Sequence, residues 1–417
     1  MKLRALIIVT ERLSANGICA ISVAKAMAER GDDVCCIVNK EYGDVERFDQ
    51  NGIHYVTVRP RLVYAINSLL GRRKDLSSIV RKTLGIVGCL INKTELFFSL
   101  PTWPVISRGY SKRILRCIQK ASDEKNFDLI IPVYTQIDTI IAARKYKALY
   151  DTEVKVLPCF LDSLAAGYGP KIKSKQWVEE RGLKWERKLL MDVNHIVIMK
   201  SSEPFYLKNK ANIPYFDKIS FLDLPLFVPK HNQNNNKKNG LIDILYVGTI
   251  PGHIRNPKYF LEVFSRTQCD GVQLTIIGPS TCESIIKEYV DKDKRIIRVQ
   301  SVPHSEAIER IDKADILLNL GNNLTTMTPS KIFEYISTGK PIISTAPIKE
   351  EPCIPYLAKY GNACIIYEDN DINESVALMT EFISNAHNVD PMELSDIFYL
   401  NQPQAFLQVI DKTLSNS

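Results

Sequence analysis

The sequence predicts an α/β protein of two domains, each a parallel sheet with helices on both faces. Its 417 residues are too many for one ordinary core and fit two domains of about 200 residues each. Short apolar runs alternate with helical patterns, and this alternation restarts after a polar, asparagine-rich stretch at 229–240. We therefore expect two Rossmann-like domains facing each other across a central cleft, with a ligand at the carboxyl ends of the strands.

The first domain is expected to span residues 1–228. Strands are predicted where short apolar, mostly β-branched runs occur, and helices where apolar residues recur every three or four positions. The expected strands are 5–9, 33–38, 53–58, 129–133, 154–160, 195–199 and 219–222, and the expected helices are 18–30, 111–125, 135–147 and 174–191. A basic, largely helical insertion at about 59–120 interrupts this pattern.

The second domain is expected to follow the linker 229–240 and to span 241–390. Its expected strands are 242–247, 273–277, 296–299, 316–320, 341–344 and 363–367, and its expected helices are 257–265, 284–290, 304–313, 355–360 and one that starts at Pro329. The chain from 373 onward has a helical pattern, and its last part, 391–417, is expected to be a C-terminal helical tail.

Composition excludes several classes of protein. With 45% hydrophobic and 24% charged residues the chain resembles ordinary soluble proteins, and no apolar run reaches the roughly 18 residues of a membrane span. The apolar run at 5–9 is short and soon followed by charges, so we expect a buried strand rather than a signal peptide. Ten scattered cysteines predict reduced thiols and a cytoplasmic location, and the six histidines show no metal-ligand spacing, so no metal site is predicted.

The positive charge is concentrated in the basic insertion. Residues 59–120 contain thirteen Lys or Arg against two acids, a net charge of +11, whereas the whole chain carries +7. Apolar and aromatic residues lie between these cations, a combination that suits an anionic membrane surface or a lipid-phosphate acceptor. No recognised nucleic-acid module accompanies the charge, so no nucleic-acid partner is predicted. The alternative interpretation is a solvated helical face over a core.

One motif in the second domain combines several features of a phosphate site. Thr328 suits a helix N-cap, Pro329 the first helical position, and Gly339 the C-terminal break. Ser330 and Lys331 then bring a hydroxyl and a cation to the helix N-terminus, which favours anions. Glu334 lies on the same face, about 6 Å along the axis from Ser330, the approximate step from a nucleotide phosphate to its ribose.

This motif resembles the donor-binding segment of GT-B glycosyltransferases of the family-4-like group, in the variant P-S-K-x-x-E-Y-x-x-x-G-K-P of bacterial surface-polysaccharide enzymes. The resemblance is strongest over 242–366 and implies that Glu334 binds ribose and Ser330 and Lys331 bind phosphate. Many relatives carry a further glutamate where this chain has Thr326, which we assign to the donor site in its place. The alternative is an ordinary amphipathic helix whose Lys331 and Glu334 pair with each other in solvent.

The same resemblance assigns roles to the loops that follow the first strand of each domain. It places Gly17 near the donor diphosphate, although a tight turn is an equal alternative. A single glycine there does not form the G-x-G-x-x-G fingerprint of NAD or FAD sites. In the second domain, Gly248 and His253 are assigned to the donor and Arg255 to the leaving diphosphate, where it would neutralise charge. Thr249 occupies the place of the family's usual arginine.

Further residues complete the expected site. The resemblance assigns the backbone near Val302 to the nucleobase. The polar loop 321–327 is expected either to line a sugar pocket or to be a solvated loop. In the first domain Asp162 is the best candidate for an acceptor contact or a general base, with a structural loop cap as the alternative. Glu186 lies where relatives carry a helical glutamate and is left unassigned.

The resemblance therefore implies a glycosyltransferase that moves a sugar from a nucleotide diphosphate to an acceptor hydroxyl. It implies retention of anomeric configuration, no metal, and no cofactor besides the nucleotide-sugar substrate. Expected partners are this donor, a saccharide or lipid-linked saccharide acceptor, and an anionic membrane at the inner cytoplasmic face. The tail at 391–417 is expected to pack back on the first domain. Alternatives are a nucleotide-sugar epimerase of the same fold and a non-catalytic nucleotide-sugar-binding subunit.

Overall fold

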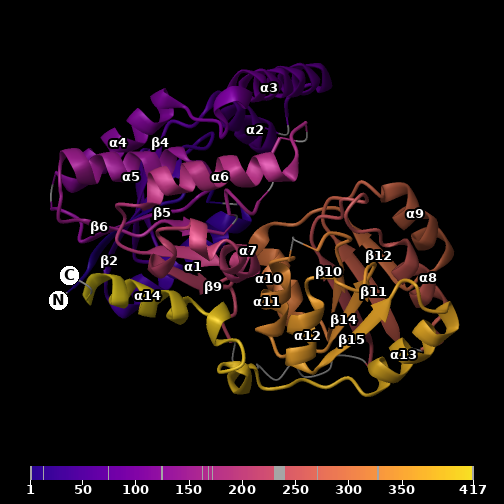
Figure 1. Cartoon of the computed structure of the whole chain (residues 1–417). Helices are drawn as coiled ribbons and strands as arrows, with labels where there is room; N and C mark the ends of the chain where they lie inside the picture. Colours follow the sequence, from indigo (N-terminus) through magenta and orange to yellow (C-terminus); the bar gives the residue numbers. More distant parts are fainter. Residues whose placement is uncertain are drawn as a thin grey trace. The chain divides into compact units, whose positions relative to one another are not determined.

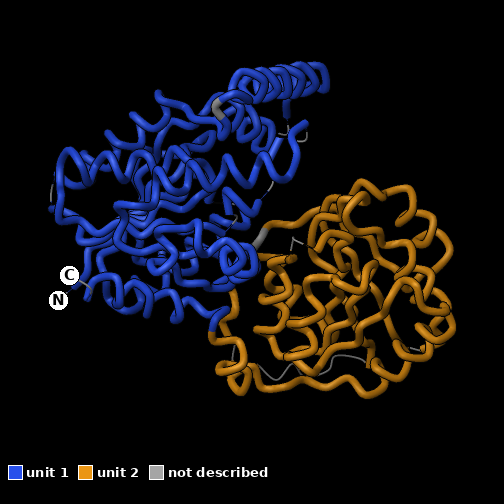
Figure 2. Tube along the Cα trace, viewed as in Figure 1, with its two compact units in different colours: residues 1–225, 400–417 blue, residues 226–399 orange. Residues whose placement is uncertain are grey.

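The computed structural model divides the chain into two compact units, residues 1–225 with 400–417 (unit 1) and residues 226–399 (unit 2) (Figure 2). It describes residues 2–415 except 13, 74, 124, 162, 168, 171, 230–239, 270 and 326–327. Most of the predicted linker therefore lies outside the described residues. Residues 226–228 and 391–399, expected in the first domain and the tail, are part of unit 2. Each unit contains a parallel sheet flanked by helices, so the predicted α/β class with two Rossmann-like domains is confirmed.

Unit 1 is built on a central sheet with the strand order β3-β4-β2-β1-β5-β6 and a three-stranded sheet β7-β8-β9. The strands are β1 (Arg4–Ile8), β2 (Asp33–Asn39), β3 (Arg47–Gln50), β4 (Ile53–Val58), β5 (Leu129–Pro132), β6 (Lys155–Val156), β7 (Cys159–Phe160), β8 (Ile196–Met199) and β9 (Ile219–Leu222). All pairs are parallel except β3 with β4. The predicted strand 154–160 is wrong as one strand, because Pro158 has no N–H to donate and β6 and β7 are separate.

Helices cover both faces of the unit 1 sheet. They are α1 (Ala15–Arg30), α2 (Leu62–Arg72), α3 (Ser78–Ser99), α4 (Arg108–Ser122), α5 (Asp138–Leu149), α6 (Lys175–Leu190), α7 (Glu203–Lys208) and α14 (Pro403–Ser415). Tyr110 and Ile114 of α4, Ile140 of α5 and Leu189 of α6 share one buried cluster with alternate residues of β1, β2 and β5. α1 and α14 pack together on the opposite face (Figure 1).

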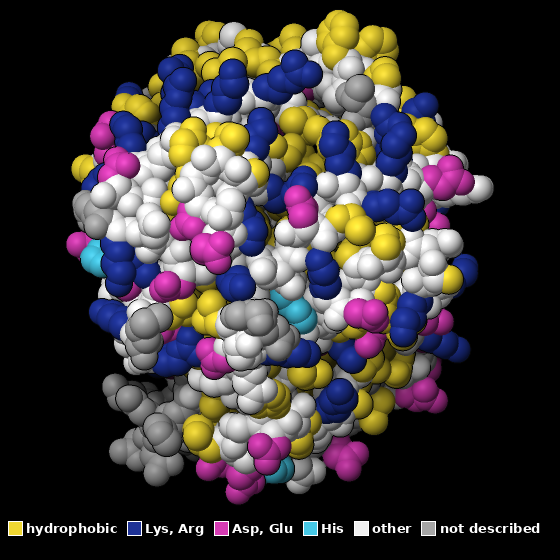
Figure 3. Space-filling view, turned by 60° about the vertical axis from the view of Figure 1, so that its left-hand side comes forward, with side chains coloured by type: hydrophobic (Ala, Val, Ile, Leu, Met, Phe, Trp, Pro, Cys, Tyr) yellow, Lys and Arg dark blue, Asp and Glu magenta, His cyan; other side chains and the backbone are white. Residues whose placement is uncertain are grey.

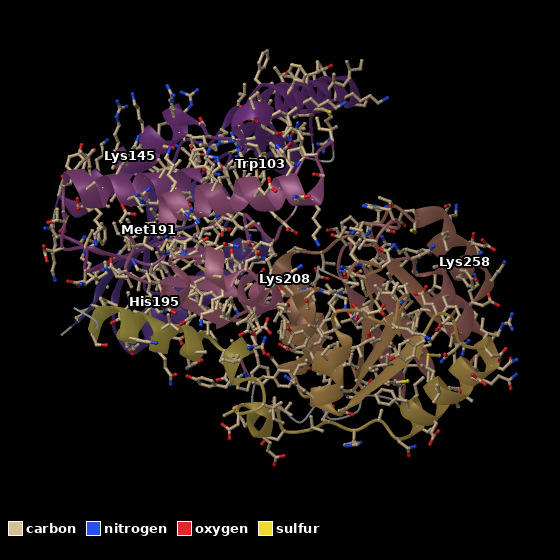
Figure 4. All side chains as sticks on the ribbon, viewed as in Figure 1. Trp103, Lys145, Met191, His195, Lys208 and Lys258 are labelled. Carbon is tan, nitrogen blue, oxygen red and sulfur yellow. The ribbon has the colours of Figure 1, made fainter. Side chains whose placement is uncertain are left out.

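The basic insertion is fixed to unit 1 at both ends. Asp138, fully buried at the start of α5, forms an ion pair with Arg61 and accepts hydrogen bonds from the Ser107 backbone N–H (3.0 Å) and the Ser111 hydroxyl (2.6 Å). After α3, Trp103 packs on Trp177 of α6, with ring centroids 6.0 Å apart (Trp103 is labelled in Figure 4). These contacts hold the base of an α2–α3 hairpin.

Unit 2 is a six-stranded, wholly parallel sheet with the order β12-β11-β10-β13-β14-β15. Its strands are β10 (Ile242–Val247), β11 (Val272–Ile277), β12 (Ile296–Val299), β13 (Ile316–Leu320), β14 (Ile342–Ala346) and β15 (Ala363–Tyr367). Its helices are α8 (Lys258–Arg266), α9 (Glu283–Lys292), α10 (His304–Lys313), α11 (Lys331–Ile336), α12 (Ile354–Tyr360) and α13 (Ile372–Ser384). α8, α9 and α13 pack on one face through a shared core (Figure 1).

One expectation for the C-terminal part of the chain needs correction, and the predicted role of Gly339 at the helix end agrees with the structure. The stretch from 373 is not one helical tail, because two short 3₁₀ turns separate α13 from α14. Gly339 lies beyond the end of α11 at φ +69°, and a Cβ there would come within 2.1 Å of the Val389 carbonyl oxygen. Only glycine therefore fits at this position, where the segment after α13 crosses the end of the helix.

Among the described residues, the structure contains no helix with the length and apolar content that crossing a bilayer requires.

Candidate functional site

The order of strands in unit 2 marks one position at the edge of the sheet as a ligand site. The chain runs outward from β10 to β12 and then returns to β13 on the other side of β10. The loops after β10 and β13 therefore leave their strands in opposite directions, at a topological switch point. Most of the predicted donor-site residues lie on these two loops or on α11, which follows the second one.

Gly248 lies directly after β10, where the backbone of this loop packs closely against the loop after β11. A Cβ on Gly278, which follows β11 at φ +124°, would come within 2.2 Å of the Gly248 carbonyl oxygen. The loops after β10 and β11 can approach this closely only because Gly278 has no side chain. A donor contact of Gly248 stays a prediction.

Arg255 connects the two loops of the switch point. Its Nε donates to Asn322 Oδ1 at 2.9 Å, and its Nη1 lies 3.5 Å from the Tyr246 hydroxyl. The Asn323 backbone N–H donates to the Ile254 carbonyl at 2.9 Å, which ties the loops together a second time. The half-buried guanidinium is thus held in one orientation, and these two contacts use only part of its five N–H donors.

A buried carboxylate, Glu351, holds Asn322, the residue that orients Arg255. Glu351, 1% exposed, accepts from the Asn322 backbone N–H at 3.2 Å and from the Cys353 N–H at 2.7 Å. Burial raises the pKa of Glu351 above its ordinary value, while these hydrogen bonds lower it. Asn322 is completely buried, so its side chain orients Arg255, and a sugar-pocket role for the rest of the loop 321–327 stays a prediction. Sequence reasoning missed Glu351, since an acid between a strand and a helix looks like an ordinary loop residue.

α11 is shorter than predicted and begins later. The N-cap is Ser330 rather than Thr328, its side chain makes no capping hydrogen bond, and the helix contains 6 residues. The Ile332 N–H bonds to the Pro329 carbonyl at 3.2 Å, an i to i+3 contact that makes the first turn 3₁₀-like. With fewer than two turns the helix dipole is small, so the chemistry of this segment depends on its side chains.

The two charged side chains of α11 form an ion pair at the edge of the sheet. Lys331 Nζ lies 3.0 Å from Glu334 Oε2, and each side chain keeps 29% of its surface exposed. The pairing considered as an alternative in the sequence therefore exists, on a partly buried surface. The neighbouring Tyr335 is buried and its hydroxyl bonds to the Val247 N–H (3.2 Å) and carbonyl (3.3 Å), which pins α11 to the end of β10.

Arg255 and α11 both contact the end of β10. Arg255 Nη1 lies 3.5 Å from the hydroxyl of Tyr246, and the Tyr335 hydroxyl of α11 bonds to the backbone of the next residue, Val247. Arg255, Lys331 and Glu334, which we call the charged group, therefore come from both sides of the switch point. Two cations and one acid gathered at this edge can bind a diphosphate and hydroxyl groups.

The remaining predicted residues of unit 2 lie around or apart from the charged group. Ser330 directly precedes Lys331 and is half-buried. The His253 side chain is exposed, and its backbone carbonyl accepts from Asn323 Nδ2 at 3.0 Å. Val302 follows β12, two strands away from β10, so it is not part of the charged group. Thr326 lies outside the described residues, and its role stays a prediction.

In unit 1, Gly17 lies in the first turn of α1. A Cβ there would come within 2.0 Å of the Glu11 carbonyl oxygen, so glycine is required for the loop after β1 to pack on the helix. This supports the tight-turn interpretation, and a donor contact of Gly17 stays a prediction. Asp162 lies outside the described residues, and its assignment likewise stays a prediction.

Residues 163–165, which follow Asp162 in the sequence, are held by Glu186, which the sequence left unassigned. Glu186 of α6 is completely buried and accepts from the Ala165 N–H and from the hydroxyls of Tyr206 and Tyr215, each at 2.9 Å. Burial raises the pKa of this carboxyl although the hydrogen bonds oppose the shift. α6 also touches the loop directly, because a Cβ on Gly182 would meet Ala165 Cα at 2.5 Å.

Comparison with known proteins identifies unit 2 by family. Residues 242–385 match the family model described as "Glycosyl transferases group 1". This range contains Arg255, Lys331 and Glu334. Comparison with curated protein sequences gave no match.

Solved structures match over the whole chain. A glycosyltransferase from Rickettsia africae ESF-5 aligns with a TM-score of 0.60 and 15% identity, covering 100% of both chains. Sucrose-phosphate synthase from Thermosynechococcus elongatus aligns at 0.59 and 13%, again over 100% of both. The lipopolysaccharide outer core galactosyltransferase WaaB in its apo form aligns at 0.52 and 14%, over 99% of both. At these identities the likeness establishes the fold. The whole chain therefore has the GT-B fold of these structures, and residues 242–385 of unit 2 match the group 1 glycosyl transferases.

Proposed function

We propose that this enzyme transfers a sugar from a nucleoside diphosphate, with UDP as the nucleotide, to an acceptor hydroxyl. The observation that carries the proposal is the charged group at the switch point of unit 2. A nucleotide sugar presents two phosphates and a ribose diol a few ångströms apart, and the charged group offers two cations and a carboxylate. Charge-assisted hydrogen bonds of this kind are the stronger ones available to a protein.

Each member of the charged group has a role in this proposal. Lys331 leaves its ion pair with Glu334 to bind a phosphate, and Glu334 accepts hydrogen bonds from the ribose hydroxyls. Arg255, already oriented by Asn322, binds the diphosphate as it departs. Ser330 donates its hydroxyl to a phosphate, and Gly248, His253, Val302 and Thr326 complete the donor site as predicted from the sequence.

We further propose that the reaction retains anomeric configuration and requires no metal ion. Both statements follow from the family-4-like resemblance of the motif at 328–341. When the glycosidic bond to the donor breaks, negative charge develops on the leaving diphosphate. The Arg255 and Lys331 side chains stabilise that charge, which is the role that a divalent cation has in other transferases.

For the acceptor we propose a saccharide, free or lipid-linked, in assembly of a cell-surface polysaccharide. The loop that Glu186 holds, with Asp162, would contact this acceptor from unit 1. The net charge of +11 over 59–120 supports peripheral binding at the inner, anionic face of the cytoplasmic membrane, where a lipid-linked acceptor would be found.

Product analysis tests this function against its two rivals. The purified chain is incubated with UDP-sugars, with and without lipid-linked saccharide acceptors extracted from membranes. We expect free UDP and a glycosylated acceptor only when the acceptor is present. An altered nucleotide sugar formed without acceptor would instead identify an epimerase. Donor binding with no product under either condition would identify a non-catalytic subunit.

A further inference from the structure

Helix α3 is apolar on two opposite faces. One face, with Leu84, Gly88 and Ile91, is covered by packing against α2. On the opposite face Ile79, Ile86, Leu90 and Phe97 follow one another at intervals of 7, 4 and 7 residues, which keeps them on one line along a helix. Their exposed fractions are 76%, 60%, 58% and 69%. A helix at a protein surface normally shows a polar outer face, so this line, the α3 stripe, is not explained by the fold.

The threonines on this face use their hydroxyl groups in hydrogen bonds within the helix. Thr83 and Thr94 lie between the members of the α3 stripe, and each hydroxyl donates to a carbonyl one turn earlier, Ile79 at 2.9 Å and Leu90 at 2.7 Å. Each threonine thus satisfies its own donor inside the helix and presents its methyl group outward. Val80, Val87 and Phe98 widen the stripe, and all three are exposed. A partner that covers this surface therefore does not have to supply hydrogen-bond donors or acceptors.

Cations surround the α3 stripe. The charged residues of α3 itself are Arg81, Lys82, Lys93 and Glu95, and none lies within the stripe. On α4, Arg108, Lys112, Arg116 and Lys120 recur every four residues and are exposed, and α4 contains no acid. Within the described part of the chain none of these four has an acid within salt-bridge distance.

The two surfaces lie at the same end of unit 1. In Figure 1 both α3 and α4 follow the upper edge of the unit, and α2 lies below α3. Figure 3 shows hydrophobic side chains along that upper edge, with a row of Lys and Arg side chains just below them. A flat anionic surface laid across this end would therefore meet the apolar stripe and the basic helix together.

We propose that α3 lies in the plane of an anionic bilayer, with the α3 stripe inserted at the boundary of the acyl chains and the α4 cations on the headgroups. About 33 Å of helix would contact the bilayer, from 22 residues at 1.5 Å each. Lys82 and Lys93, both on one flank of the stripe, can extend their charged ends to the headgroups. The inference rests on the proposed membrane-bound acceptor for its purpose, and it adds hydrophobic insertion to electrostatic attraction.

Vesicle sedimentation of the full chain tests insertion separately from charge. The probes are vesicles of phosphatidylcholine alone and of phosphatidylcholine with phosphatidylglycerol, at low and high salt. We expect binding to the anionic vesicles that high salt weakens but does not abolish. The variant Ile79→Gln, Ile86→Gln, Leu90→Gln, Phe97→Gln should bind at least tenfold more weakly. A matched control, Leu149→Gln, Ile172→Gln, Leu207→Gln, replaces exposed apolar residues elsewhere on unit 1 and should bind like wild type.

Two further measurements, the depth to which α3 inserts and the transferase activity, distinguish the remaining outcomes. Phe97→Trp should gain fluorescence that brominated lipids quench, whereas Leu149→Trp should not. Transfer to a soluble acceptor should be the same in the stripe variant and wild type, so a chain that binds vesicles but transfers no sugar refutes the proposed function only. Equal vesicle binding by wild type and the stripe variant would overturn the insertion. A wild-type dimer that the stripe variant dissociates, without vesicle binding, would show an interface between copies and overturn it too.

Discussion

Replacing Arg255 with alanine should lower kcat/KM for sugar transfer by about 10²- to 10³-fold. This is the usual loss when an enzyme is deprived of one preorganised hydrogen-bond donor that stabilises negative charge in the transition state. The side chain is held for this role by Asn322 at 2.9 Å, and Asn322 by the buried Glu351 at 3.2 Å. Because the diphosphate carries more negative charge in the transition state than in the bound substrate, kcat should fall more than KM rises. Steady-state kinetics at saturating acceptor measures both.

A matched control separates this effect from loss of a surface cation. Arg266→Ala removes an arginine of the same unit whose partner is Glu262, one turn earlier on the exposed side of α8, at 2.6 Å. Such a pair contributes little, so activity and folding should stay at wild-type levels. If Arg255→Ala changed kcat/KM by less than about tenfold, or 1.4 kcal/mol, Arg255 would not be a catalytic residue.

Replacing Glu186 with alanine should lower the free energy of unfolding of unit 1 by about 3 kcal/mol or more. The substitution leaves the Ala165 N–H and the hydroxyls of Tyr206 and Tyr215 without their buried acceptor, and each such group contributes a penalty of about 1–3 kcal/mol. All three tryptophans, at positions 103, 177 and 185, belong to unit 1, so denaturant titration followed by tryptophan fluorescence reports on this unit alone. Glu180→Ala, at an exposed position of α6, is the control and should unfold like wild type.

Glutamine at position 186 should behave differently, because it keeps an acceptor but does not titrate. Burial raises the pKa of Glu186 in the folded chain above its ordinary value of 4.5. Between these two pKa values the folded state binds more protons than the unfolded state, so wild-type stability falls as pH rises through this interval. The stability of Glu186→Gln relative to wild type should therefore increase from pH 4.5 toward neutrality. A constant difference across this range would show that Glu186 is ionised in both states.

Much of the fold could be predicted because parallel strands buried on both faces appear as continuous apolar runs. β10, β12, β13 and β15 have the bounds expected from the sequence. The edge strand β3, Arg47–Gln50, was missed because its single apolar residue, Phe48, lies among charged and polar ones and makes no apolar run. The sequence also could not show how α3 packs. Apolar residues occupy both of its faces, so the apolar pattern does not distinguish the face that packs on α2 from the exposed one.

Only those features of the candidate site that depend on residues close together in the sequence could be predicted. Lys331 and Glu334 were predicted from residue types at short spacings, and Arg255 from the family resemblance. The support of Arg255 joins distant parts of the chain, as Glu351 with Asn322 (29 residues apart) shows. In unit 1, the pair of Asp138 with Arg61 (77 residues apart) is of the same kind. No local pattern encodes such pairs, because the partners meet only when the sheet edge forms. The length of α11 was overestimated for a related reason, since the i to i+3 contact from Ile332 to Pro329 depends on how the loop after β13 ends.

The most direct test of the central claim is whether UDP binds to unit 2 through Glu334. Thermal unfolding is followed with UDP, GDP, CDP and ADP, on wild type, on Glu334→Ala and on Glu350→Ala, a control at an exposed position of the same unit. A ligand at 100 times its dissociation constant stabilises the folded state by about 2.7 kcal/mol, a readily measured increase in Tm. We predict that UDP raises the Tm of wild type and Glu350→Ala and raises that of Glu334→Ala much less. An equal UDP shift in Glu334→Ala and wild type would contradict the assignment of the donor to this edge of the sheet.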